Sequence, residues 1–112
     1  MSVTLGLTPS THDIGDVVRV TATFLSTGST NSDPTNVGFL YDTPTSTAPS
    51  TATRTSTGID TVNGITRVST GVYYFDLTTT GKGLYEGRFV GDSPVVASGE
   101  SWFSVRPRRV TT

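Results

Sequence analysis

The sequence predicts a single all-β domain in which two sheets pack face to face as a sandwich. The first observation is composition: 23 Thr and 13 Ser make up 36 of the 112 residues, and the β-branched Thr favours strands. The second is a series of short segments in which apolar and polar residues alternate with a period of two. The third is that turn residues separate these segments about every eight to twelve positions. No window shows a helical period, so we expect almost no helix.

The clearest strand covers residues 17–25, where Val18, Val20, Ala22 and Phe24 fall on one face and polar residues fall on the other. Six other segments bring the expected number of strands to seven: 3–7, 37–41, 62–68, 72–78, 84–90 and 101–106. Their inward faces carry the largest apolar side chains. We expect six aromatic residues to form one core: Phe24, Phe39, Phe75, Tyr85, Phe89 and Phe103.

Residues 43–58 form a low-complexity stretch of Thr, Ser and Pro. Pro44 and Pro49 would interrupt a hydrogen-bonded ladder, and no large apolar residue follows them until Ile59. We expect a surface loop or a weak edge strand here, outside the core. Residues 106–112 form a basic C-terminal tail.

Charge and cysteine content argue against several function classes. Eight basic and nine acidic residues give a formal net charge of −1, which is not the basic footprint of a nucleic-acid-binding protein. No run of 18 apolar residues is present to span a membrane. The first residues lack the basic start and apolar stretch of a signal peptide. With no cysteine, there is no disulfide, thiolate zinc site or cysteine nucleophile, and we expect no cofactor.

Three polar sites could carry chemistry, and we prefer a structural interpretation of each. His12, the only histidine, lies in a polar loop between the first two strands. Residues 91–94 are similar to the nucleophile turn of some hydrolases, but such a turn must lead into a helix, so we expect a hairpin turn. Some of the four aspartates in or beside loops could meet at one end of the sandwich to bind calcium: Asp13, Asp16, Asp33 and Asp92. No two acids stand at positions i and i+2, so turn and capping roles are expected instead.

The segment Thr80-Gly81-Lys82-Gly83-Leu84-Tyr85-Glu86-Gly87 is similar to the tyrosine corner of immunoglobulin-like domains. In that pattern a Tyr opens the penultimate strand and its hydroxyl bonds back to the backbone. Gly87 stands where antibody domains carry a cysteine, so the likeness is to relatives without a disulfide. Residues 69–75 are a second candidate, but only one strand follows Tyr85, as this topology requires. The resemblance implies a seven-stranded immunoglobulin-like (fibronectin type III-like) β-sandwich.

The order of four segments resembles that in small immunoglobulin-like proteins encoded among the head and neck genes of tailed bacteriophages. The segments are 15–24, 33–35, 69–73 and 103–107. The resemblance spans nearly the whole chain. It implies a non-enzymatic virion structural protein, either a capsid decoration (cement) protein docked on the capsid lattice or a neck or tail component. The implied partner is the major capsid protein or another virion protein, with homo-oligomers on the particle. It implies neither a nucleic-acid nor a membrane partner.

Three kinds of side chain are candidates for partner binding. The basic tail residues are suited to pairing with carboxylates on a partner. A Trp that is out of phase with the inward residues of its strand marks either an interface or local packing. A first strand with alternating apolar residues can pair with its own sheet or with a neighbour's. The candidates are Arg106, Arg108, Arg109, Trp102, Val3 and Leu5. Tyr85, Phe24 and Phe89 are expected to be structural. The alternative function is a carbohydrate- or cell-surface-binding module, with Trp102 and Tyr74 as stacking platforms.

Overall fold

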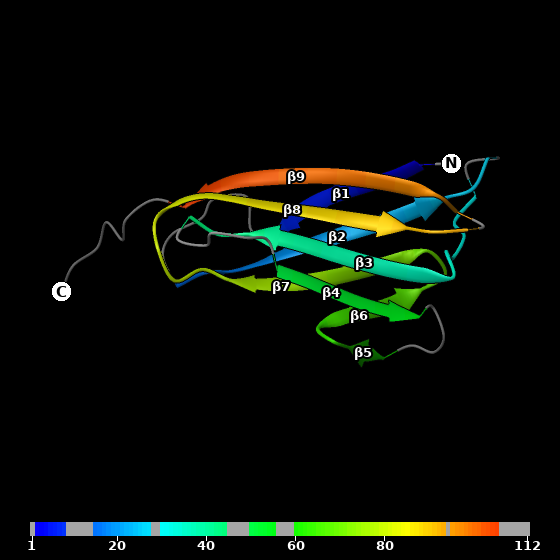
Figure 1. Ribbon diagram of the computed structural model, residues 1–112, viewed down its shortest axis with the longest axis horizontal. Coiled ribbons are helices and arrows are strands. Elements are labelled where there is room, and N and C mark those ends of the chain that lie inside the picture. The colour runs from blue at the N-terminus through cyan, green and yellow to red at the C-terminus, as the bar shows by residue number, and fades with distance from the viewer. Residues whose placement is uncertain are drawn as a thin grey trace.

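The computed structural model describes residues 2–8, 15–27, 30–44, 50–55, 60–93 and 95–105. Within these ranges the chain forms nine strands and no helix, arranged as two antiparallel sheets that face each other (Figure 1). The strands are β1 (Ser2–Thr8), β2 (Val17–Leu25), β3 (Asn36–Asp42), β4 (Ser50–Thr55), β5 (Thr61–Val62), β6 (Ile65–Ser69), β7 (Val72–Thr78), β8 (Gly83–Gly91) and β9 (Ala97–Val105). One sheet has the order β1-β2-β7-β6-β5 and the other has β4-β3-β8-β9. The predicted all-β fold with two facing sheets is confirmed.

The core lies between the sheets, where side chains alternate inward along each strand. Phe39 of β3 lies at its centre, because its ring centroid is 4.6 Å from those of both Phe75 and Phe89. The rings of Tyr85 and Phe103 stack at 5.2 Å, and both residues are buried in this core. The six predicted aromatic residues belong to this core, with Phe75 only partly buried.

The segment predicted as one strand over 62–68 is two strands joined by a tight turn. Asn63 and Gly64 both have positive φ, at 53° and 86°, which is the backbone of a two-residue hairpin turn. A Cβ on Gly64 would lie 2.8 Å from the Phe75 ring, so the turn packs closely on β7. The Asn-Gly pair was a readable hairpin signal, and the prediction of one continuous strand was wrong.

The Thr-rich segment 43–58 also requires a correction. Residues 50–55 form β4, an edge strand that pairs with β3, so the loop interpretation is wrong for these six residues and the edge-strand alternative is correct. Along β4 the inward positions hold Ala52, which is half-buried against the core, and Arg54, which is buried. Neither residue gives the strong apolar alternation that marks a strand in sequence.

Strand β1 lies at an edge of the five-stranded sheet and packs against β9 of the other sheet. Val3 and Leu5 of β1 are half-buried and pack against the core. A Cβ on Gly99 of β9 would lie 2.8 Å from the Val3 side chain, so glycine at position 99 allows this close approach. Val3 and Leu5 therefore belong to a strand paired with its own sheet, one of the two pairings expected for it, and their role in partner binding stays a prediction.

Candidate interaction surface

The Tyr85 ring is buried at the start of β8, and its hydroxyl binds the backbone just upstream. The hydroxyl donates to the Gly81 carbonyl at 2.9 Å and accepts from the backbone N–H groups of Thr80 and Gly81, both at 3.2 Å. These contacts fix the turn between β7 and β8. They match the geometry expected of Tyr85 and give it a structural role.

Four arginines in the described part of the chain each form an ion pair with a carboxylate: Arg19 with Asp76, Arg54 with Asp60, Arg67 with Asp33, and Arg88 with Glu100. The Arg19–Asp76 pair lies on the outer face of the five-stranded sheet, where the guanidinium also lies 3.7 Å from the centroid of the Tyr74 ring. Most of the positive charge in this part of the chain is therefore engaged within the fold itself.

Arg54 has a side chain with no exposed surface. Its Nη1 donates to the carbonyl oxygens of Asp60 and Ile65 at 2.7 and 3.0 Å, and its Nη2 donates to Asp60 Oδ1 at 2.9 Å. These bonds tie β4 to the β5–β6 hairpin of the opposite sheet. A buried guanidinium held in this way is structural, because its desolvation is offset by its hydrogen bonds. Sequence reasoning missed it, although Arg54 is the only charged residue between 43 and 59.

Asp33 joins the segment after β2 to the β6–β7 turn. Its Oδ1 accepts from the Tyr73 hydroxyl at 2.7 Å and from the Gly71 N–H at 2.8 Å, and its Oδ2 accepts from Arg67 Nη2 at 2.7 Å. Gly71 has a φ of 77°, and a Cβ there would lie 2.8 Å from the backbone nitrogen of Ser32. Glycine is therefore required where these two segments meet.

The pKa shifts in this cluster follow from its contacts. Burial opposes ionisation of Asp33, but hydrogen bonds from Arg67, Gly71 and Tyr73 outweigh it and hold the pKa of the carboxyl below its ordinary 3.8. Burial, together with the hydrogen bond to Asp33, raises the pKa of Tyr73 to about 12. At neutral pH the Asp33 carboxylate therefore binds the neutral Tyr73 phenol and the Arg67 cation. These contacts give the cluster a structural role, because they hold the segment after β2 against the β6–β7 turn.

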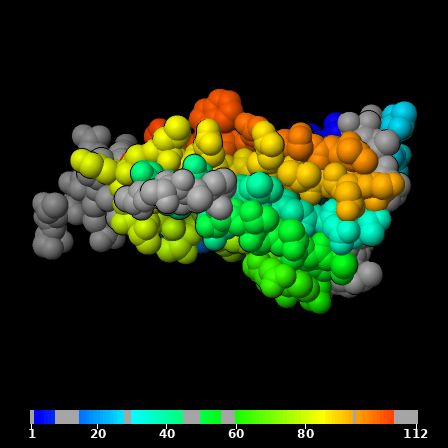
Figure 2. Space-filling model, in the orientation of Figure 1, coloured from blue at the N-terminus to red at the C-terminus, as the bar shows by residue number. Residues whose placement is uncertain are grey.

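A shallow groove of about 310 Å³ crosses the outer face of the four-stranded sheet. Its lining residues come from β3, β8 and β9: Leu40, Tyr41, Asp42, Glu86, Gly87, Arg88, Glu100, Ser101 and Trp102. The strand register sets Asp42, Glu86 and Trp102 side by side, with Leu40, Arg88 and Glu100 in the next outward row. Figure 2 views this face, with β8 and β9 in yellow and orange above β3 and β4.

Some charged side chains of the groove face an opposite charge and others face a like charge. Arg88 and Glu100 form an ion pair across β8 and β9. Asp42 and Glu86 face each other across β3 and β8, and Oδ1 of Asp42 is buried with no hydrogen-bond partner in the described part of the chain. Like charges opposed across two strands are destabilising, and an unpaired buried oxygen costs further free energy. The groove therefore has a local excess of negative charge.

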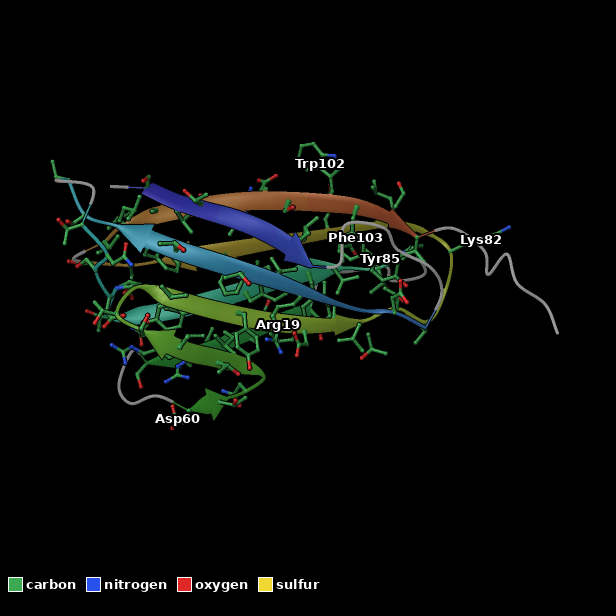
Figure 3. All side chains as sticks on the ribbon, turned by 180° about the vertical axis from the view of Figure 1, so that it is seen from behind. Arg19, Asp60, Lys82, Tyr85, Trp102 and Phe103 are labelled. Carbon is green, nitrogen blue, oxygen red and sulfur yellow. The ribbon has the colours of Figure 1, made fainter. Side chains whose placement is uncertain are left out.

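Trp102 forms one wall of this groove. Its relative exposure is 62 %, and Figure 3 shows it pointing away from the body of the molecule. Of the two interpretations left open by its phase, the structure supports the exposed one. Tyr74 lies on the other sheet, half-buried beneath Arg19, so these two aromatic residues do not form one stacking platform.

The remaining predicted positions are dispersed or lie outside the described residues. His12, Asp13, Arg106, Arg108 and Arg109 belong to the latter group. Asp16 precedes β2 and Asp33 follows it, so these two of the aspartates considered for calcium lie beyond opposite ends of that strand. Asp92 instead binds the backbone and side chain of Asn36, at 2.7 and 2.9 Å. Among the described residues, no group of three or more His, Cys, Asp or Glu side chains is placed to hold a metal ion.

Comparisons of the chain with protein-family models, with curated proteins and with solved structures found no match. No helix among the described residues is long and apolar enough to cross a membrane.

Proposed function

We propose that this protein is a non-enzymatic structural protein of a tailed-phage virion, a capsid decoration protein docked on the capsid lattice or, as the second location, a neck or tail component. The proposal starts from the ordered sequence resemblance to small immunoglobulin-like head and neck proteins. It is supported by one structural observation, the strand order of the two sheets. Fold by itself does not fix function, so the test must be made on particles.

The strand order fits an immunoglobulin-like assignment. The seven strands A to G of such a domain can be assigned in chain order to β1, β2, β3, β6, β7, β8 and β9. The first sheet then contains A-B-E-D and the second contains C-F-G, as in constant-type domains. Strand β4 is then an added edge strand next to C, and β5 is an addition beside D. Tyr85 lies at the start of the strand assigned as F, where the tyrosine corner belongs.

Attachment to the particle would use surface that the fold leaves over. The tail carries Arg106, Arg108 and Arg109, which suit bidentate pairing with carboxylates of the major capsid protein or another virion protein. Trp102 offers an exposed aromatic anchor. Each exposed ion pair is weak, but many symmetric copies on a lattice bind together through avidity.

Binding to particles tests this proposal. We expect mass spectrometry to detect the chain in purified virions, and we expect the full-length protein to cosediment with particles that lack it. Deletion of residues 107–112 should weaken this binding, and more strongly at raised salt. Lys82→Gln, which removes a positive charge outside the tail, is the control and should bind as the native chain does. A truncated chain that stays bound as firmly would show that attachment runs through residues 26–36 or 43–58 instead.

A carbohydrate- or cell-surface-binding module is the second candidate, and the exposed Trp102 beside groove carboxylates is the observation that favours it. A sugar stacked on this ring would change the fluorescence of the only Trp in the chain. Titration with a panel of surface glycans should then give a saturable signal that Trp102→Ala abolishes. The virion proposal expects no such signal.

A further inference from the structure

Within the described part of the chain, the ion pairs leave the Asp42–Glu86 end of the groove without an opposite charge. Four of the five basic residues in this part of the chain are engaged in ion pairs, which leaves Lys82. On the acidic side, Asp42 and Glu86 stand next to each other in the groove, and the arginine that lines the same groove, Arg88, is paired with Glu100. The other positive charges of the chain are the three arginines in residues 106–109.

We infer that the groove binds the basic tail, residues 106–112, of a second copy of this chain. An incoming guanidinium between Asp42 and Glu86 would relieve their mutual repulsion and pair with the exposed Glu86 carboxylate. The neighbouring Trp102 ring offers a face for the same cation, and Trp is the best aromatic partner for such contacts. The groove therefore presents both features that bind an arginine side chain, a carboxylate pair and an exposed indole.

The direction of β9 favours a second copy over the chain's own tail. Strand β9 carries Trp102 and ends at Val105, so the segment that follows starts beyond the Asp42–Glu86–Trp102 row. To return to this row it would have to reverse the direction of β9. The same tail can enter the groove of another copy without this reversal. The resulting contact joins two different surfaces, so it would build rings or open chains of subunits.

The test is complementation between two full-length variants in solution. The groove variant carries Asp42→Asn and Glu86→Gln, and the tail variant carries Arg106→Gln, Arg108→Gln and Arg109→Gln. We expect the native chain to self-associate with rising concentration in sedimentation velocity, and each variant alone to do so about three- to tenfold more weakly. A mixture of the two should form heterodimers, because one intact groove meets one intact tail.

Two controls show whether the effect belongs to this contact. Asp76→Asn removes a carboxylate from the opposite sheet, and Lys82→Gln removes a cation outside the tail; both should associate as the native chain does. Trp102 fluorescence gives an independent reading, which should change with concentration in the native chain and not in the tail variant. Circular dichroism confirms that each variant is folded, and a groove variant that fails to fold is replaced by Glu86→Gln alone.

Three results would overturn the inference. These are a native chain that stays monomeric throughout, a variant mixture that forms no heterodimer, or a tail-dependent Trp102 signal that is independent of concentration and therefore reports the chain's own tail. Because only purified protein is used, these outcomes are independent of the virion proposal. A chain that binds particles yet never self-associates would retain that proposal and reject this one.

Discussion

Two carboxylates of this molecule, Asp33 and Asp42, differ in how many hydrogen-bond donors the fold provides for them. Asp33 accepts hydrogen bonds from a guanidinium, a phenol and a backbone N–H. Asp42 faces another carboxylate, Glu86, and has a buried oxygen with no partner in the described part of the chain. Asp33 lies in the connection between β2 and β3, Asp42 is the last residue of β3, and both are only partly exposed. The difference lies in what surrounds them.

This difference separates a structural site from a candidate binding site. A carboxylate whose acceptor positions are filled by its own fold stabilises that fold and has little left for a partner. A carboxylate pair without a cation costs stability in the free protein and gains most when a cation arrives. We therefore expect loss of stability from changes near Asp33 and loss of association, with no loss of stability, from changes at Glu86.

The largest effect is expected from the core that supports the satisfied site. Phe24 is fully buried, its ring meets the Tyr73 ring edge-on at 5.8 Å, and its backbone bonds to Gly71 and Ser32. Phe24→Ala should reduce the free energy of unfolding by about 3–5 kcal/mol, measured by urea denaturation. A loss below about 1 kcal/mol would contradict the central packing of this ring.

Asp33→Asn should cost about 1.5–3 kcal/mol, because hydrogen bonds to a charged group are lost or weakened. The pKa of Asp33 is lower in the folded state than its ordinary 3.8, so on acidification the unfolded chain takes up the proton first. The stabilisation is fully present above about pH 5 and is lost as the pH falls toward the folded-state pKa.

Unfolding measured between pH 2 and pH 7 checks both points, and the native chain should lose more stability in acid than Asp33→Asn does. Asp76→Asn is the matched control, since it breaks an exposed ion pair and should cost less than about 1 kcal/mol. If the native chain and Asp33→Asn lost the same unfolding free energy between pH 7 and pH 2, Asp33 would not be the group that causes the loss of stability in acid.

The Tyr85 hydroxyl is a second polar group whose hydrogen bonds are all made within the fold, and Tyr85→Phe removes it. The change keeps the ring in the core but removes the hydroxyl that donates to Gly81 and accepts from Thr80 and Gly81. We expect a loss of about 0.5–1.5 kcal/mol in the free energy of unfolding. An unchanged urea midpoint would mean that these bonds do not hold the β7–β8 turn.

The sequence was sufficient for the parts of the fold that large apolar residues determine. Phe24, Phe39 and Phe89 mark strands by alternation because burial of large side chains dominates the folding energy. Strand β4 was harder to predict, since its inward positions hold Ala52 and Arg54, and the buried Arg54 is stabilised by hydrogen bonds that include partners on the opposite sheet. These partners depend on tertiary packing, which periodicity does not report.

The features of the candidate groove also differ in how far the sequence could predict them. The phase of Trp102 relative to Phe103, a local property of one strand, placed its side chain off the inward face but left open whether it was exposed or packed. The pairing of Asp42 with Glu86 depends on the register between β3 and β8, which joins segments more than 40 positions apart. Their positions in the sequence gave no sign that they would meet.

The smallest expected effect has the opposite sign and tests the comparison most directly. Glu86→Gln removes one of two opposed negative charges, so the free energy of unfolding should rise by about 0.2–1 kcal/mol. Glu100→Gln is the matched change in the same groove, but it breaks the ion pair with Arg88 and should leave stability unchanged or slightly lower. Urea midpoints at low protein concentration, where self-association is negligible, measure both variants. If Glu86→Gln destabilised the protein as Glu100→Gln does, Glu86 would have a stabilising partner in the free chain, and the groove would be another satisfied site of the kind formed by Asp33.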